Sequence, residues 1–328
     1  MIKVILALCF LSISVYAAPV LSPTWKLDVN ASVKDMVLHD NTLVIGTDNG
    51  TLKIYDLEAE KFSKVISLPK VKDFMGDLMP PKVFSVDATN NTYVLLSDSG
   101  EGGYVNVWLN KEGETTQIIS AKDKKVIVKV RFIDEHHLLF GYLSNEAGLY
   151  DLTERKELYK VQLSESKFSD FALNEKKKQA VFACESGVLN VIDTQTGKIE
   201  KVLKGQNLDN VHMVGFVHEI VTSAGQDRRA GIYDVSTGKG SYLPSDFFIY
   251  ATGISPSAKS IAFSMDEDNT ITVYHRESKS EIAQLKGQHS TLNSIIFQDE
   301  NTIFASSNNS VVMMWKINGT SNKKGKNK

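Results

Sequence analysis

Cysteine is almost absent from this 328-residue chain, which contains only Cys9 and Cys184. Cys9 lies in an N-terminal segment that we expect to be removed, so Cys184 would have no partner for an internal disulfide. Cys184 ends an apolar stretch, residues 180–184, in which a small buried side chain is expected rather than a reactive thiol. The sequence therefore excludes a disulfide-stapled fold.

An excess of positive charge is also missing. The formal net charge is −2, and it becomes −3 if a leader that contains Lys3 is removed. Domains that bind nucleic acid usually carry a strongly basic surface, so no nucleic-acid partner is expected. The only basic cluster lies at the end of the chain, and residues 319–328 are predicted to form a solvated, disordered tail.

The apolar run from Val4 to Val15 is about a dozen residues long, which is shorter than the ~20 residues of a membrane span. It follows Lys3 and precedes Val15-Tyr16-Ala17, whose small or aliphatic residues stand where a signal peptidase reads the chain. We therefore predict a signal peptide over residues 1–17, cleaved after Ala17, and no membrane span in the mature chain. The alternative is an uncleaved anchor.

Helical periodicity is nearly absent, and a turn followed by a short strand recurs in its place, first over residues 48–56. The copies are marked by one residue near the end of each strand, namely Tyr55, Trp108, Tyr150, Ile192, Tyr233, Tyr274 and Trp315. The gaps between these markers are 53, 42, 42, 41, 41 and 41 residues. Seven copies at a nearly fixed period indicate one closed repeat architecture.

Each repeat contains four short strands separated by polar turns, as residues 168–203 show most clearly. This repeated order of strands and turns predicts an all-β fold, a seven-bladed β-propeller with four-stranded antiparallel blades, over residues 18–318. The last repeat, residues 289–317, lacks its outer strand, whereas residues 23–29 read as a lone strand before the first repeat. We expect this N-terminal strand to complete the last blade and close the ring.

The repeats resemble those of WD-repeat propellers over essentially the whole mature chain. In that family the third strand ends in Trp-Asp, which is matched in part by Tyr55-Asp56, Tyr150-Asp151, Ile192-Asp193 and Tyr233-Asp234. The family's Gly-His opening survives as Gly287-Gln288-His289. The resemblance implies a hydrogen bond from the His289 imidazole to the strand that contains Trp315.

An exported, disulfide-free propeller of this size, with a degenerate repeat, is similar to the NapL-type accessory proteins. These are encoded with the periplasmic nitrate reductase of epsilonproteobacteria. The resemblance implies a periplasmic location, a monomer, and components of that reductase as protein partners. It supplies no catalytic or ligand residue.

Motifs that carry chemistry are scarce. The seven histidines make no metal-ligand spacing, and neither a Cys-x-x-Cys-His haem site nor a Gly-x-Ser-x-Gly nucleophile elbow is present. Acids are frequent in the turns, but Asp and Asn are selected there for hydrogen bonds to the backbone. We therefore predict no catalytic residue, no bound metal and no cofactor. The acidic turn residues are Asp48, Asp98, Glu146, Glu185, Asp227, Asp266, Glu267 and Asp268.

The one irregular gap, between Tyr55 and Trp108, carries about eleven extra residues, and the insert is assigned to residues 69–82. Exposed apolar side chains on a long loop are plausible contacts for a partner, although they could instead fold back over the core. Arg228, Arg229, Phe247 and Phe248 are further candidates, because Arg and aromatic residues are enriched at interface hot spots. The candidates within the insert are Phe74, Met75, Asp77, Leu78 and Met79.

The sequence thus favours a non-enzymatic interaction platform that assists assembly, maturation or electron delivery of the periplasmic nitrate reductase. One alternative is a lactonase- or hydrolase-type propeller with a metal at the channel mouth. Several acids or amides converging on the ring axis would favour that enzyme. Another alternative is a scaffold of outer-membrane assembly, which only the identity of the partner would distinguish.

Overall fold

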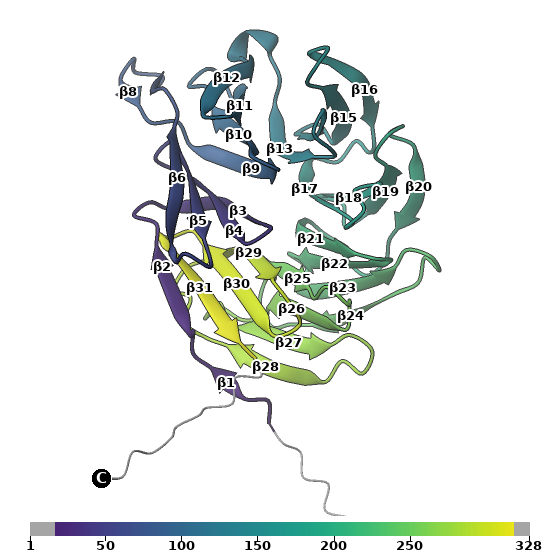
Figure 1. Ribbon diagram of the computed structural model, residues 1–328. Coiled ribbons are helices and arrows are strands. Elements are labelled where there is room, and N and C mark those ends of the chain that lie inside the picture. The colour runs from purple at the N-terminus through teal and green to yellow at the C-terminus, as the bar shows by residue number, and fades with distance from the viewer. Residues whose placement is uncertain (1–16, 318–328) are drawn as a thin grey trace, which may run out of the picture.

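The computed structural model describes residues 17–317, and nearly all of its regular structure is β-strand. Seven four-stranded antiparallel sheets follow one another along the chain as the blades of a β-propeller, arranged in a ring (Figure 1). Among the described residues the only helical element is the short turn η1 (Ala121–Asp123). The predicted fold class is confirmed.

The first five blades each run outward in chain order, so that their first strands meet at the centre of the ring. Blade 1 contains β3 (Val33–His39), β4 (Thr42–Thr47), β5 (Thr51–Asp56) and β6 (Lys61–Ser67). Blade 2 contains β9 (Val83–Thr89), β10 (Thr92–Asp98), β11 (Val105–Lys111) and β12 (Glu114–Ile119). Blade 3 contains β13 (Ile127–Phe132), β14 (His137–Tyr142), β15 (Glu146–Asp151) and β16 (Lys156–Gln162).

Blades 4 and 5 repeat this order. Blade 4 contains β17 (Phe168–Leu173), β18 (Gln179–Cys184), β19 (Leu189–Asp193) and β20 (Ile199–Leu203). Blade 5 contains β21 (Val211–Val217), β22 (Ile220–Gly225), β23 (Arg229–Asp234) and β24 (Gly240–Pro244).

The last two blades both receive a strand from the N-terminal segment. Blade 7 contains β29 (Leu292–Phe297), β30 (Thr302–Ser307) and β31 (Val311–Lys316), and β2 (Trp25–Asp28) pairs antiparallel with β31 as its outer strand. Blade 6 contains β25 (Thr252–Ile254), β26 (Ser260–Ser264), β27 (Ile271–His275) and β28 (Glu281–Leu285). The predicted closure of the ring is therefore confirmed. An unexpected fifth strand, β1 (Val20–Leu21), pairs parallel with β28.

The burial of each strand follows its place in the blade. Middle strands such as β14 and β18 are covered on both faces and read as apolar runs, with burial at nearly every position. Outer strands such as β16 alternate between exposed and half-buried residues, as a sheet with one solvated face requires.

The apolar core is divided into seven clusters, each shared by two adjacent blades, and the set includes the contact between blades 7 and 1. Cys184, at the end of β18, is buried as predicted, with no exposed surface. Each blade buries its two apolar faces only against its neighbours. The apolar core of every blade is therefore complete only in the closed ring.

The Gly-His resemblance is wrong in its detail. His289 is exposed, and the buried Gln288 makes the contacts instead. The Gln288 side chain donates to the Ala305 carbonyl at 3.2 Å and accepts from the Ser307 hydroxyl at 2.9 Å. The Trp315 indole donates to the Lys286 carbonyl at 3.1 Å. A buried amide satisfies these strands as an imidazole would, because it also offers both a donor and an acceptor.

Residues 1–16 of the predicted signal peptide (residues 1–17) lie outside the described residues, as does the predicted tail, residues 319–328. Within residues 17–317, no helix has the length and apolar content to cross a membrane.

Trp25 tests the closure of the ring, because its ring lies 5.4 Å from that of Tyr55 in blade 1 and 6.1 Å from that of Phe304 in blade 7. We expect Trp25→Ala to lower the free energy of unfolding by about 2–3 kcal/mol, since both aromatic contacts are lost together. The matched control Lys26→Ala, on the exposed face of the same strand, should change it by less than about 0.5 kcal/mol. Equal effects of the two substitutions in urea unfolding would contradict this role.

Candidate functional site

The two faces of the ring differ in apolar exposure. We call the insert face the one formed by the turns between second and third strands, by the connections from each outer strand to the next blade, and by the first two residues of the inner strands that follow those connections. Among the described residues it carries eight of the fourteen large apolar side chains that are exposed, and the other six lie on outer strands. The opposite face carries none of the fourteen. The eight are Phe74, Met75, Leu78, Met79, Phe84, Leu143, Leu208 and Phe248.

The insert forms a small hairpin of two strands, β7 (Val71–Lys72) and β8 (Leu78–Met79), which stands out from the ring near β6 (Figure 1). Asp73 shapes its tip, because one carboxylate oxygen accepts from the backbone N–H groups of Met75 and Asp77, both at 2.9 Å. Gly76 completes the turn with a φ of 91°, a conformation that favours glycine.

The apolar side chains of this hairpin point into solvent. Phe74 is 93% exposed, Met75 72%, Leu78 63% and Met79 41%. The alternative that these side chains fold back as a cover on the core is therefore wrong. Asp77 is also exposed. The hairpin presents an apolar tip whose shape is set by its own backbone hydrogen bonds.

The base of the hairpin is fixed to blades 1 and 2. Pro80 and Pro81 lie against Gly50, at the β4–β5 turn, closely enough to contact a Cβ placed there. The Lys72 carbonyl similarly packs on Gly100, at the β10–β11 turn. The Asp98 N–H donates to the Lys82 carbonyl at 3.0 Å. The tip is thus carried on a rigid base.

The remaining candidates lie on the same face, but over blades 5 and 6. Phe247, Phe248 and Tyr250 form an aromatic group, and the His212 ring stacks on Tyr250 with centroids 4.9 Å apart. Burial lowers the pKa of His212. Phe248 is 40% exposed, whereas Phe247 is half-buried.

Arg228 and Arg229 differ in their environments. Arg228 is exposed, with a φ of 64° at the β22–β23 turn. Arg229 is held within its blade, since its guanidinium lies 4.6 Å from the centre of the Tyr242 ring. The structure therefore places the predicted contact residues on one face, in two groups on different blades.

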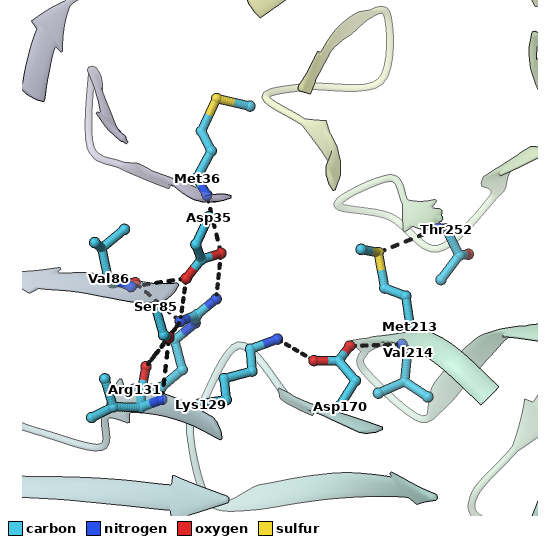
Figure 2. Close-up of polar contacts among 11 residues, drawn as sticks. Asp35, Met36, Ser85, Val86, Lys129, Arg131, Asp170, Met213, Val214 and Thr252 are labelled. Carbon is cyan, nitrogen blue, oxygen red and sulfur yellow. Dashed lines mark hydrogen bonds and ion pairs between the residues drawn. The ribbon is translucent and has the colours of Figure 1, made fainter. Parts of the chain in front are cut away.

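Sequence reasoning missed a third feature, a cavity of about 530 Å³ in the central channel. In six blades a β-bulge skips the second residue of the inner strand and turns the strand at the channel. Residues that follow the bulges form much of the wall, and Figure 2 shows several of them around an open centre. The third residues of these six inner strands are Asp35, Ser85, Lys129, Asp170, Met213 and Ser294, and all of them except Ser85 line the cavity.

An ion pair joins blades 1 and 3 across this channel wall. The Arg131 guanidinium binds Asp35 through two nitrogens, at 2.9 and 3.1 Å (Figure 2). It also donates to the Ser85 hydroxyl at 2.7 Å and to the Val86 carbonyl at 3.0 Å, both in blade 2. One side chain therefore bridges three blades, with the two-pronged geometry that arginine offers a carboxylate.

Carboxylates also accept from the backbone of the next blade. Asp35 accepts from the Val86 N–H at 2.8 Å, and Asp170 accepts from the Val214 N–H at 2.9 Å. Lys129 donates to Asp170 at 2.5 Å. Asp87 accepts from the Phe132 N–H at 2.7 Å. These bonds fix the inner strands of blades 1 to 5 against one another.

Two of these carboxylates have pKa values displaced in opposite directions. Burial raises the pKa of Asp35, but the charges of Arg131 and Lys129 outweigh it, so that the net pKa is lowered. Burial also raises the pKa of Asp87, and here it prevails over the attraction of Arg131 and Lys177, neither of which forms an ion pair with this carboxylate.

Several acidic residues of the turns accept hydrogen bonds from backbone N–H groups. Asp48 accepts from the Ser32 N–H at 3.0 Å, and Asp227 accepts from the Leu208 N–H at 2.7 Å. On the opposite face, Glu175 accepts from the His218 N–H at 2.8 Å. No group of three His, Cys, Asp or Glu side chains within residues 17–317 is placed to hold a metal ion.

The channel network could not be found from the repeat pattern, because its members are far apart in sequence. Asp35 and Arg131 are separated by 96 positions, and each stands in a different repeat. The signal that was available is a charged residue inside an otherwise apolar inner strand, as in Ile127–Phe132. Such residues become neighbours only once the ring has been assumed.

No protein-family model matches this chain, and a search of curated proteins found no similar sequence. The seven-bladed architecture itself supports the resemblance to WD-repeat propellers.

Arg131→Met should lower the free energy of unfolding by about 3–5 kcal/mol, because it leaves the Asp35 carboxylate buried without its cation. The double variant Asp35→Asn/Arg131→Met removes both charges and should recover a large part of that loss. Urea unfolding of the four proteins of this cycle gives the coupling. Additive losses would show that the pair does not act as a unit.

Asp87→Asn should alter how stability depends on pH. The ordinary pKa of Asp is 3.8 and the folded-state pKa of Asp87 is raised, so the folded protein binds the proton more tightly than the unfolded chain. Stability of the natural protein should therefore fall as pH rises from about 4 through that raised pKa, with a limiting slope of ~1.4 kcal/mol per pH unit. Asp87→Asn should lack this component and gain stability relative to the natural protein over the same window. A difference that does not vary with pH between about 3.5 and 7 would contradict the assignment.

Proposed function

We propose that this protein is a non-enzymatic interaction platform that holds a protein partner on its insert face. The observation that carries the proposal is the distribution of exposed apolar side chains, of which eight lie on the insert face, six on outer strands and none on the opposite face. Single exposed apolar residues are ordinary on soluble proteins, but a group gathered on one face, with four members on one hairpin, is typical of an interaction site.

The hairpin is the proposed main contact. Burial of its exposed side chains would contribute about 25 cal/mol for each Å² of apolar surface removed from water. Its base is fixed to blades 1 and 2, so little freedom of the backbone is lost on binding. Phe248 and Arg228 form a second group, on the same face over blades 5 and 6, which a large partner would also reach.

We propose further that the platform works in the periplasm as an accessory factor of the nitrate reductase. A role in assembly, maturation or electron delivery fits its resemblance to the NapL-type proteins. The signal peptide predicted over residues 1–17 supports the location. A rigid ring would act by presenting its loops, and it would assist electron delivery by positioning the redox proteins against one another.

The test compares the hairpin with an equally apolar surface elsewhere on the same chain. The hairpin variant carries Phe74→Ser, Met75→Ser, Leu78→Ser and Met79→Ser. The control variant carries Val65→Ser, Leu158→Ser, Ile199→Ser and Val202→Ser, at positions on outer strands that are also exposed. We expect the tagged natural protein and the control to recover nitrate reductase subunits from the native envelope, and the hairpin variant to recover at least about tenfold less.

Both variants should keep the thermal transition of the natural protein within a few degrees, because all eight side chains are exposed. Equal recovery by the two variants would refute the hairpin as the contact. Recovery of outer-membrane assembly proteins alone would refute the assignment to the reductase and favour the scaffold alternative.

A further inference from the structure

The central cavity has properties that the proposed platform does not require. It occupies about 530 Å³, within the range of pockets that bind small molecules in proteins. Its charged side chains come from blades 1 to 4, whereas blades 5 to 7 contribute an uncharged and mostly apolar wall. The apolar residues of that wall include Met213, Ile254 and Ile296, and its polar residues are Thr252, Asn293 and Ser294. A cavity with one charged and one apolar side fits an amphipathic ligand.

The hydrogen bonds along the charged side indicate whether that ligand carries a positive or a negative charge. Both oxygens of Asp35 are occupied, one by the Met36 N–H and Arg131, the other by the Val86 N–H and Arg131. Each oxygen of Asp170 likewise has a donor, Lys129 for one and the Val214 N–H for the other. The charges of Asp35 and Asp170 are thus already paired, with Arg131 and Lys129. Asp87, the third carboxylate of the lining, accepts from the Phe132 N–H, and burial raises its pKa, which disfavours its charged form.

The cations Lys129 and Arg131, in contrast, can donate more hydrogen bonds than they make. Lys129 can donate three hydrogen bonds, and Asp170 is its one hydrogen-bond partner within the described chain. Its ammonium extends into the open centre between the Arg131 and Met213 sides of the channel (Figure 2). One terminal nitrogen of Arg131 donates to Asp35, to Ser85 and to two backbone carbonyls. The other terminal nitrogen donates, among the described residues, to Asp35 alone. This wall therefore offers a ligand hydrogen-bond donors that carry positive charge.

We propose that the channel binds a small carboxylate with an apolar body. Its carboxylate would accept from Lys129 and Arg131, and its apolar part would lie against Met213, Ile254 and Ile296. Met213 suits this position because its unbranched thioether adapts to ligands of different shape. The site is separate from the hairpin, which belongs to the insert face, so the two proposals can fail independently.

The experiment measures binding of 4-methylpentanoate by isothermal titration calorimetry. Its neutral amide, 4-methylpentanamide, and the amine 4-methylpentylamine have nearly the same shape and serve as matched ligands. We expect saturable binding of the carboxylate and at least about tenfold weaker binding of the other two, because only the carboxylate receives charge-assisted hydrogen bonds.

Two variants assign the site. Asp170→Asn releases Lys129 from its ion pair and should bind the carboxylate several-fold more tightly. Lys129→Met/Asp170→Asn removes the pair together, so that no buried charge is left alone, and should lose the preference for carboxylate. The hairpin variant should bind the carboxylate as the natural protein does.

Equal or tighter binding of the amide or the amine would overturn the proposal. So would the absence of saturable carboxylate binding to both the natural protein and Asp170→Asn at millimolar concentration. If the double variant does not fold, as judged by its thermal transition, the comparison of ligands on Asp170→Asn still decides the question.

Discussion

The pairing of β2 with β31 is the interaction on which the rest of the molecule depends. The core is divided among seven contacts between adjacent blades, so each blade has two apolar faces and no blade has a core of its own. The contact between blades 7 and 1 contains Val29 and is flanked by Trp25 and Leu27, all from the N-terminal segment. Without that segment, both the outer edge of blade 7 and the seam of the ring would be exposed to water.

The channel network is a second consequence of the closed ring. Arg131 reaches Asp35 across blade 2 only because three inner strands are held at fixed distances around the axis. Buried ion pairs contribute little to stability unless their remaining hydrogen bonds are satisfied, and here the Asp35 oxygens and one Arg131 nitrogen are well supplied. The arrangement fixes the orientation of the blades and leaves Lys129 facing the cavity.

The fold could be predicted because each repeat can be recognised from its local sequence. Residues such as Tyr55 and Trp315 recur at one point in each blade, and the missing outer strand of the last repeat predicted the role of residues 23–29. The parallel strand β1 could not be recognised in this way, since two residues carry no periodicity. The hairpin was found by the break in the period. The exposure of its side chains was left open, because an apolar residue in an insert serves equally well for packing and for contact.

The failures have a common physical origin. His289 was assigned by analogy with a motif, whereas the structure uses Gln288, one position earlier, for the same hydrogen bonds. Asp35, Lys129 and Arg131 were not selected as site residues, because a charged residue in a strand is visible in the sequence but its partner in another blade is not. Interactions between repeats depend on how the blades are arranged around the axis, and the period alone does not specify that arrangement.

The N-terminal segment also has a consequence for how the chain is made. Residues 20–28 precede the first blade, yet their partners β28 and β31 belong to the last two blades. During synthesis these residues therefore emerge before any blade and acquire their hydrogen-bond partners only when the last two blades have been made. Contacts of such large sequence separation form slowly, and an unfinished ring exposes strand edges in the meantime. Completion of the ring is thus tied to the synthesis of β31, so a product truncated before that strand would keep an open seam that quality-control proteases can recognise.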